Sequence, residues 1–356
     1  MTTVPIHVLG NVDLDLSLGP LRTLPNWGTE VVAAGPSTYR PGGAAGNTAL
    51  ALGGLARRGQ GLTLEELERV AAASLSGARP GAASASDSGG ASGICVYCAI
   101  GEDEQGRKLQ ALFQATGLGG RLEALPGDLT SLGLALVRED GERAFVTDLG
   151  ALRRMDLGWA RQALRSVRGP GLFLLNGVSL LPALPPADAA ALLHDMHQRG
   201  LQTCLDTGWD VDDWPRPVVQ GWRQALANVD FFFPNDLEAK ALTGESDPIR
   251  AARALQGLSG GTVVVKLGPE GAVLADGRGV RTVATEPLPV ADTTGAGDVF
   301  NAGFLYALSL GWPPEDAVRL GHRVAAQVLA NRRTYFPSLD ELGLVPSGPG
   351  SNASWE

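Results

Sequence analysis

The sequence predicts an α/β protein built on a mostly parallel β-sheet that helices cover on both faces. Patterns typical of helices lie between short apolar runs, so strand and helix alternate along the chain. Such alternation predicts βαβ units whose ligands bind beyond the carboxyl ends of the strands. The runs that predict buried strands are 5–12, 94–100, 171–176, 201–206, 230–233 and 262–266.

Four segments depart from this alternation. Residues 14–41, with an extended piece at 30–33, and 133–150, with a turn at 139–142, predict hairpins that project from the main sheet. Residues 60–93 begin with a helix-like piece at 62–75 and continue as a run of small residues. We interpret 60–93 as an insertion, mostly a mobile surface loop, with a regulatory or partner-binding loop as the alternative. Residues 345–356 predict a disordered tail behind a single domain over 1–340.

Charge and hydropathy exclude several classes of protein. The 356 residues include 29 lysines and arginines against 38 aspartates and glutamates, which argues against a nucleic-acid partner. There is neither an apolar run long enough to span a bilayer nor a start that resembles a signal peptide. We therefore expect a cytoplasmic protein without a membrane partner.

The few lysines and cysteines exclude other sites. No lysine lies in a GxxxxGK[ST] arrangement, so a P-loop is excluded, and no GxGxxG follows the first strand, which argues against a Rossmann dehydrogenase. Cys95 and Cys98 lie three apart on a predicted strand and so face opposite sides. With Cys204 they are predicted to be buried thiols rather than metal ligands.

The segment ADTTGAGDVFNA, residues 291–302, is the most informative part of the chain. A glycine-rich turn leads into a helical pattern that ends at Gly311, so Asp298 is predicted in the first turn of a helix. Unpaired N–H groups at a helix start attract anions, and glycines let the backbone approach a phosphate. Residues 293–297 therefore predict a phosphate cradle, with Asp298 as proton acceptor in phosphoryl transfer. The alternative is an ordinary helix start with a dipole-stabilising aspartate.

Two further motifs suit a polyol. Asp13 and Asp15 follow the first strand on one side of an extended segment, where carboxylates can accept hydrogen bonds from paired hydroxyls. Gly42 and Gly43 precede a predicted helix, and Asn47 in its first turns offers both a donor and an acceptor. Solvated aspartates and a tight strand-to-helix turn are the structural alternatives.

Two motifs in the second half each have two interpretations. Asn235 and Glu238 have the spacing of a helix capping box and of an NxxE motif. Lys266, Gly268 and Gly271 form the segment KLGPEG after a predicted strand, which favours either a nucleotide-binding turn or a structural hairpin.

These motifs together resemble the PfkB, or ribokinase-like, family of carbohydrate kinases. The resemblance rests on the GAGD run, on GG-x-x-x-N at 42–47, and on GEDEQGR at 101–107. It implies a three-layer sandwich with a small β lid formed by 14–41 and 133–150. It also implies Asp298 as catalytic base, an anion hole at Gly295, Ala296 and Gly297, and substrate contacts at Asp13, Asp15, Gly42, Gly43 and Asn47. The implied ATP contacts are Asn235, Glu238, Lys266, Gly268, Gly271, Thr293 and His322.

The resemblance implies ATP and Mg²⁺ as cofactors and a small sugar or polyol as acceptor, phosphorylated at a primary alcohol. It also implies a potassium site at Asp292 and Thr294. The sequence leaves this site undecided because 321–336 departs from the family pattern, with His322 where an asparagine is common. A homodimer through the lid is also implied. The alternatives are a nucleoside kinase of the same fold, with Trp27, Tyr39 and Phe145 as possible aromatic walls, and a non-catalytic sugar-binding sensor.

Overall fold

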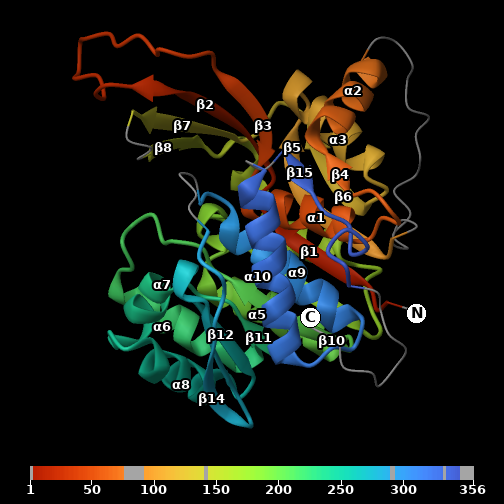
Figure 1. Ribbon diagram of the computed structural model, residues 1–356, viewed down its shortest axis with the longest axis vertical. Coiled ribbons are helices and arrows are strands. Elements are labelled where there is room, and N and C mark those ends of the chain that lie inside the picture. Colours follow the sequence, from red (N-terminus) through yellow and green to blue (C-terminus); the bar gives the residue numbers. More distant parts are fainter. Residues whose placement is uncertain (1–2, 76–91, 140–142, 289–292, 332–333, 345–356) are drawn as a thin grey trace.

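The protein is organised around one large, mostly parallel β-sheet (Figure 1). The computed structural model describes residues 3–75, 92–139, 143–288, 293–331 and 334–344. Within these residues the sheet runs in the order β14-β13-β12-β11-β10-β9-β1-β5-β6, with β13 and β14 antiparallel at one edge. Its strands are β1 (Ile6–Gly10), β5 (Ile94–Gly101), β6 (Gly119–Leu125), β9 (Gly171–Asn176), β10 (Leu201–Asp206), β11 (Phe231–Phe232), β12 (Thr262–Lys266), β13 (Ala272–Asp276) and β14 (Gly279–Val283).

The six predicted apolar runs all become strands of this sheet, which confirms the predicted fold class. Strands β1, β5 and β9 are buried along their whole length, as expected for strands covered on both faces. Cys95 and Cys98 are buried thiols, as is Cys204 on β10.

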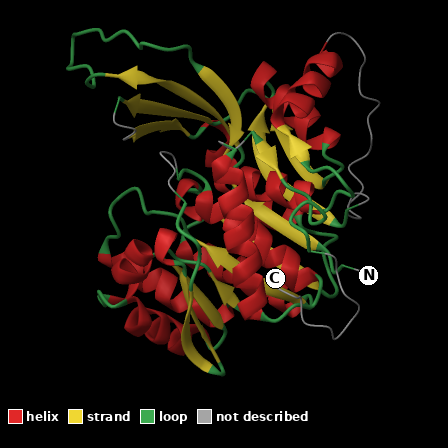
Figure 2. Ribbon diagram, viewed as in Figure 1, coloured by secondary structure: helices red, strands yellow, loops and turns green. Residues whose placement is uncertain are grey.

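Helices cover the sheet on both faces and complete a three-layer sandwich (Figure 2). Helix α9 packs on both α1 and α10, while α5, α6 and α8 form a second group that contacts β10, β12 and β13. The helices are α1 (Ala44–Leu55), α3 (Glu104–Ala115), α4 (Leu157–Ala163), α5 (Pro186–Gln198), α6 (Arg216–Ala225), α7 (Asp236–Thr243), α8 (Pro248–Ser259), α9 (Ala296–Ser309) and α10 (Pro314–Ala330). Short 3₁₀ helices span Gly150–Arg154, Val178–Leu180, Leu226–Asn228 and Gly268–Glu270.

A second sheet of four strands projects from this body as the lid (Figure 1). Its order is β3 (Thr38–Gly42), β2 (Asp13–Leu21), β7 (Leu132–Arg138) and β8 (Arg143–Asp148), with β2 parallel to β7. The lid arises from the two predicted segments. The extended piece expected at 30–33, however, forms no strand, and most of the expected turn at 139–142 lies outside the described residues.

The segment 60–93 corrects a prediction. Its first part is not a surface loop, because β4 (Leu62–Thr63) pairs with β15 (Tyr335–Phe336) and α2 (Leu64–Leu75) packs on α3. Leu62 and Leu67 are fully buried in the core. The helix-like piece predicted at 62–75 is present as α2. Residues 76–91 and the tail 345–356 lie outside the described residues.

None of the described helices is long and apolar enough to cross a membrane.

Helices α9 and α10 approach each other through two glycines. A methyl group on Gly303 would lie 2.8 Å from the Cα of Gly321 and 2.9 Å from the carbonyl oxygen of Leu320. Two glycines therefore let α10 pack directly against the helix that carries Asp298.

We predict that Gly303→Ala lowers the free energy of unfolding by about 1–3 kcal/mol, because the added methyl group must push the two helices apart. The control is Gly257→Ala on α8, where a methyl group meets no atom within 4 Å. That change should raise stability by up to about 1 kcal/mol through helix propensity. Urea unfolding followed by circular dichroism measures both, and equal effects would contradict the close packing.

Candidate active site

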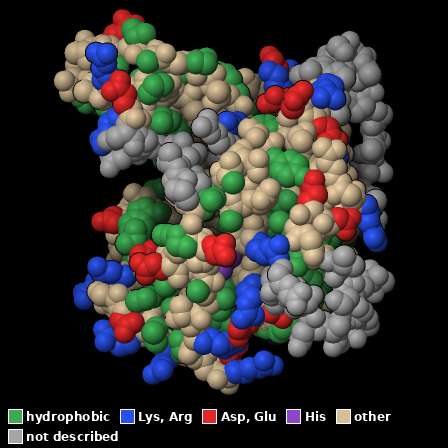
Figure 3. All heavy atoms as spheres, in the orientation of Figure 1, with side chains coloured by type: hydrophobic (Ala, Val, Ile, Leu, Met, Phe, Trp, Pro, Cys, Tyr) green, Lys and Arg blue, Asp and Glu red, His purple; other side chains and the backbone are tan. Residues whose placement is uncertain are grey.

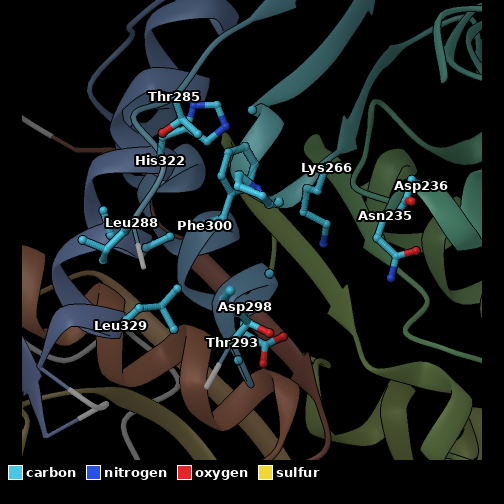
Figure 4. A pocket seen from close by; sticks show the side chains of 18 of the residues that line it. Asn235, Asp236, Lys266, Thr285, Leu288, Thr293, Asp298, Phe300, His322 and Leu329 are labelled. Carbon is cyan, nitrogen blue, oxygen red and sulfur yellow. The ribbon is translucent and has the colours of Figure 1, made fainter. Parts of the chain in front are cut away.

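A cavity of about 630 Å³ opens at the carboxyl ends of the parallel strands. Figure 3 shows a gap between the projecting lid and the body of the molecule, and the residues that line the cavity all belong to the body. The cavity brings together the end of β10, the starts of α7 and α9, the turn after β12, and one face of α10 (Figure 4). It is lined by Asp206, Gly208, Asn235, Asp236, Glu238, Lys266, Gly268, Pro269, Gly271, Thr285, Glu286, Leu288, Thr293, Gly295, Ala296, Gly297, Asp298, Phe300, His322, Ala325, Ala326 and Leu329.

The start of α9 has the predicted form. Gly295 lies immediately before the helix in the left-handed region, with φ of 77°, and Asp298 is the acidic residue of the first turn. One predicted feature differs: the N–H of Ala296 already donates to the carbonyl of Thr293 at 3.0 Å. Ala296 is therefore not available as an anion-hole donor in this conformation. Gly295 and Gly297 line the cavity beside it.

Asp298 is held by the neighbouring helix α1. Asn47 Nδ2 donates to Asp298 Oδ2 at 3.0 Å, and Thr48 Oγ1 donates to the Asp298 carbonyl at 3.0 Å. Asn176, at the end of β9, donates to Thr48 Oγ1 at 2.9 Å. The structure thus places Asn47, a predicted substrate contact, against the predicted base, where its amide orients the carboxylate.

The two lid aspartates lie at the root of the lid. Asp13 is only 3% exposed and accepts a hydrogen bond from Asn11 Nδ2 at 3.1 Å. A methyl group on Gly42 would overlap the Asp15 carboxylate and lie 2.7 Å from Asp13 Oδ1, and one on Gly133 would lie 2.7 Å from Asp15 Oδ1. Gly42 therefore gives the two carboxylates room. Gly43 has a positive φ of 80° and lets the chain turn into α1.

If Asp13 and Asp15 bind the acceptor of a kinase, as the resemblance implies, Gly42→Ala should raise KM for that acceptor by about 10- to 100-fold and leave ATP binding normal, because the methyl group displaces both carboxylates. Gly277→Ala, where no atom lies within 4 Å of the added group, is the control. Steady-state kinetics with varied acceptor and calorimetric titration with ATP separate the two effects. An unchanged acceptor KM would show that Asp13 and Asp15 do not depend on this space.

The structure confirms the capping interpretation of the NxxE motif. Asn235 and Glu238 form a complete capping box at the start of α7, with both hydrogen bonds at 2.8 Å. Both residues also line the cavity. Burial and the nearby Asp206 carboxylate raise the pKa of Glu238 to about 7. The cap thus holds a buried carboxyl group at the cavity wall.

The KLGPEG segment is likewise both hairpin and cavity wall. It joins β12 to the antiparallel β13, and Gly271 has a positive φ of 93°. Lys266, Gly268 and Gly271 line the cavity, and Lys266 points into it (Figure 4).

Sequence reasoning missed Asp206, the last residue of β10. Its Oδ2 accepts hydrogen bonds of 2.6 Å from Lys266 Nζ and from Asn301 Nδ2, and its Oδ1 accepts from the N–H of Gly208 at 3.1 Å. Burial alone would lower the pKa of Lys266, but the attraction of Asp206 and Glu238 outweighs it and raises that pKa. The available signal was the position of a carboxylate at the carboxyl end of a predicted parallel strand.

The other end of the cavity is apolar. Leu288, Phe300 and Leu329 line it with His322, whose ring centroid lies 5.2 Å from that of Phe300 (Figure 4). Burial lowers the pKa of His322 to about 4, so the imidazole is neutral at pH 7.

The predicted potassium site lies partly outside the described residues. Asp292 lies outside the described residues, and Thr294 is not among the residues that line the cavity. In the described part of the chain, no three histidine, cysteine or acidic side chains gather as a metal site.

Comparisons with known proteins agree with this geometry. The family model described as "pfkB family carbohydrate kinase" matches residues 82–341, which is most of the chain. A cytidine kinase of Thermococcus kodakarensis is 29% identical over 71% of this chain and 87% of its own length. A ribokinase of Haemophilus influenzae is 25% identical over 65% of this chain and 74% of its own.

Solved structures agree on the fold. The fructokinase of Vibrio cholerae O395, in a structure with fructose, ADP and calcium bound, superposes with a TM-score of 0.69 at 20% identity and covers 96% of this chain and 99% of its own. A family model that spans most of the chain and kinases among its relatives lead to one assignment. The chain belongs to the pfkB family of carbohydrate kinases.

Proposed function

We propose that this kinase transfers the γ-phosphoryl group of ATP to a hydroxyl, a primary alcohol, of a sugar or sugar-like acceptor. One observation carries the proposal: the Asp298 carboxylate lies at the start of α9, beside Gly297 and fixed by Asn47. Asp298 lies where the cavity meets α1, the helix that follows Gly42 and Gly43. A carboxylate there can reach an acceptor hydroxyl on one side and a phosphate on the other.

The residues divide the chemical work. Asp298 accepts the proton of the attacking hydroxyl, and Asn47 keeps its carboxylate oriented. The N-terminal end of α9, with Gly295 and Gly297, stabilises the charge on the transferring group. Asp13 and Asp15 accept hydrogen bonds from the acceptor's other hydroxyls. Closure of the lid excludes water and so limits ATP hydrolysis.

The carboxylates of the cavity fit Mg²⁺. Mg²⁺ keeps several waters and binds proteins through one or two carboxylates together with substrate phosphates. Glu238, Asp236 and Asp298 line the cavity, and one oxygen of Glu238 is engaged in the cap. Glu238 would hold the water shell of a Mg²⁺ carried in on the triphosphate. The ion, when bound, supplies neutralisation of the phosphate charge.

The wall of Leu288, Phe300, His322 and Leu329 suits the base of the nucleotide. We place the base of the nucleotide beside this apolar wall at α10 and its phosphates beside Gly297 at the start of α9. In this placement the triphosphate lies beside Lys266 and Thr293, between the nucleotide base and the acceptor.

We expect Asp298→Asn to lower kcat by about 10²- to 10⁴-fold, the usual contribution of a general base, with ATP binding retained. Asp188→Asn is the matched control, because Asp188 is also an aspartate in the first turn of a helix, α5. ADP release measures turnover, and calorimetry measures ATP binding. Turnover near that of the unchanged protein in Asp298→Asn would rule out this base.

A nucleoside is a second candidate acceptor, and the lid register favours it. Ser17 pairs with Ala135, which pairs with Phe145, so Phe145 lies on the face that bears Asp15. Tyr39 lies on the opposite face, since it pairs with Leu16. Phe145 is 53% exposed, so its ring is accessible for stacking on the base of a nucleoside. The cytidine kinase relative supports this candidate, and the opposite face is the one a homodimer through the lid would use.

A panel of fructose, ribose, ketodeoxygluconate, adenosine and cytidine, assayed by ADP release, identifies the acceptor class. If nucleosides are used, Phe145→Ala should lower kcat/KM for them by about 3- to 10-fold through lost stacking, and leave simple sugars unaffected. Tyr39→Ala, on the other face and 55% exposed, is the control. Equal losses of kcat/KM in both variants would contradict a specific contact between Phe145 and the acceptor. Binding of a compound from the panel without ADP release would favour a sensor.

A further inference from the structure

We propose that Asp206 is a positioning residue, which holds the ammonium group of Lys266 against the start of α9 and away from Asp298. The inference rests on the proposed function in one respect, the placement of the triphosphate beside Gly297. It assigns a role to a residue that lies in neither of the glycine motifs.

The first observation is the geometry around Lys266. Its Nζ donates to Asp206 Oδ2 at 2.6 Å, and the two side chains are 14% and 7% exposed. A methyl group on Gly297 would lie only 3.1 Å from this Nζ. The ammonium therefore lies against the backbone of Gly297, whose N–H belongs to the proposed anion hole. A full positive charge thus reinforces the helix dipole at this point.

The second observation is the charge of the cavity wall. Lys266 is the one lysine or arginine among the described residues that line the cavity, whereas Asp206, Asp236, Glu238, Glu286 and Asp298 are acidic. An ammonium has three N–H donors, and a lysine stem is flexible. If Asp206 did not accept a hydrogen bond from Lys266, the other carboxylates whose charge attracts the ammonium group are Glu238 and Asp298. A pair with Asp298 would weaken the base and remove the cation from the phosphate.

The third observation is that Asp206 is itself fixed on both sides. Asn301, one turn after Asp298 on α9, donates to the same Oδ2 at 2.6 Å, and the Gly208 N–H donates to Oδ1. Asp206 is 5% exposed and Asn301 is fully buried. The carboxylate therefore links β10, β12 and α9, and a rotation of Lys266 toward another partner would break this buried arrangement.

A double-mutant cycle tests the proposal. Lys266→Met should lower kcat/KM for ATP by about 10²-fold, as loss of a charged donor to the transferring group does, and Asp206→Asn should have a similar effect. If Asp206 acts through Lys266, the double variant should lie within about 3-fold of Lys266→Met. Lys266→Arg, which keeps the charge, should retain part of the activity in the presence of Asp206 and lose it in Asp206→Asn.

The control breaks a comparable ion pair elsewhere. Asp276→Asn removes one of the two acidic partners of Arg281, which is 2.9 Å away on the β13–β14 hairpin and outside the set of residues that line the cavity; Glu315 is the other. It should leave kcat/KM for ATP unchanged even if it lowers the melting temperature. Thermal unfolding of every variant identifies those that fail to fold.

Two results would overturn the proposal. One is a double variant whose loss equals the product of the two single losses, which would mean that Asp206 acts independently of Lys266. The other is an Asp206→Asn variant with the kcat/KM of the unchanged protein. If the unchanged protein releases no ADP with any acceptor, the proposed function fails instead, and the same cycle in calorimetric affinity for ATP still tests the link between Asp206 and Lys266.

Discussion

The functional geometry of this kinase depends on the contact between the starts of two helices. Helices α1 and α9 each begin immediately after a glycine with positive φ, Gly43 and Gly295, and they meet where Asn47 and Thr48 bind Asp298. One hydrogen bond fixes the carboxylate and the other fixes the backbone that carries it. The Asp298 carboxylate therefore has a set position relative to both the lid root, which precedes α1, and the cavity, which α9 helps to line.

Much of this arrangement was predictable from local sequence. Apolar runs between helical patterns predict buried parallel strands, and such strands bring their carboxyl ends to one edge of a sheet, which is where Asp298, Lys266 and Glu238 lie. The start of α9 was predictable because a glycine-rich turn followed by apolar residues at helical spacing is typical of the start of a helix. The capping box at Asn235 follows from spacing alone.

The remainder depends on contacts that local patterns do not encode. The pair Asp206 and Lys266 joins two strands far apart in sequence, and a single carboxylate at a strand end does not reveal its partner. Asn47 was predicted as a polar residue near the acceptor, but its bond to Asp298 needs the relative placement of two helices. The N–H of Ala296 is engaged by Thr293 through a turn whose geometry the letters TTGAG leave open. The burial of 62–75 was not predictable from its own sequence, because Leu62 pairs with Phe336, a residue far along the chain.

That strand pair also bears on the order in which the molecule is completed. β4 lies in the first fifth of the chain, and its partner β15 lies close to the end of the described residues. Gly54 of α1 packs directly on Phe336, since a methyl group there would lie 2.8 Å from the Cβ of that phenylalanine. During synthesis, the flank of α1 stays uncovered until the ribosome has released residue 336. The helix that holds the Asp298 carboxylate thus reaches its final packing only after residue 336 has emerged, long after its own residues.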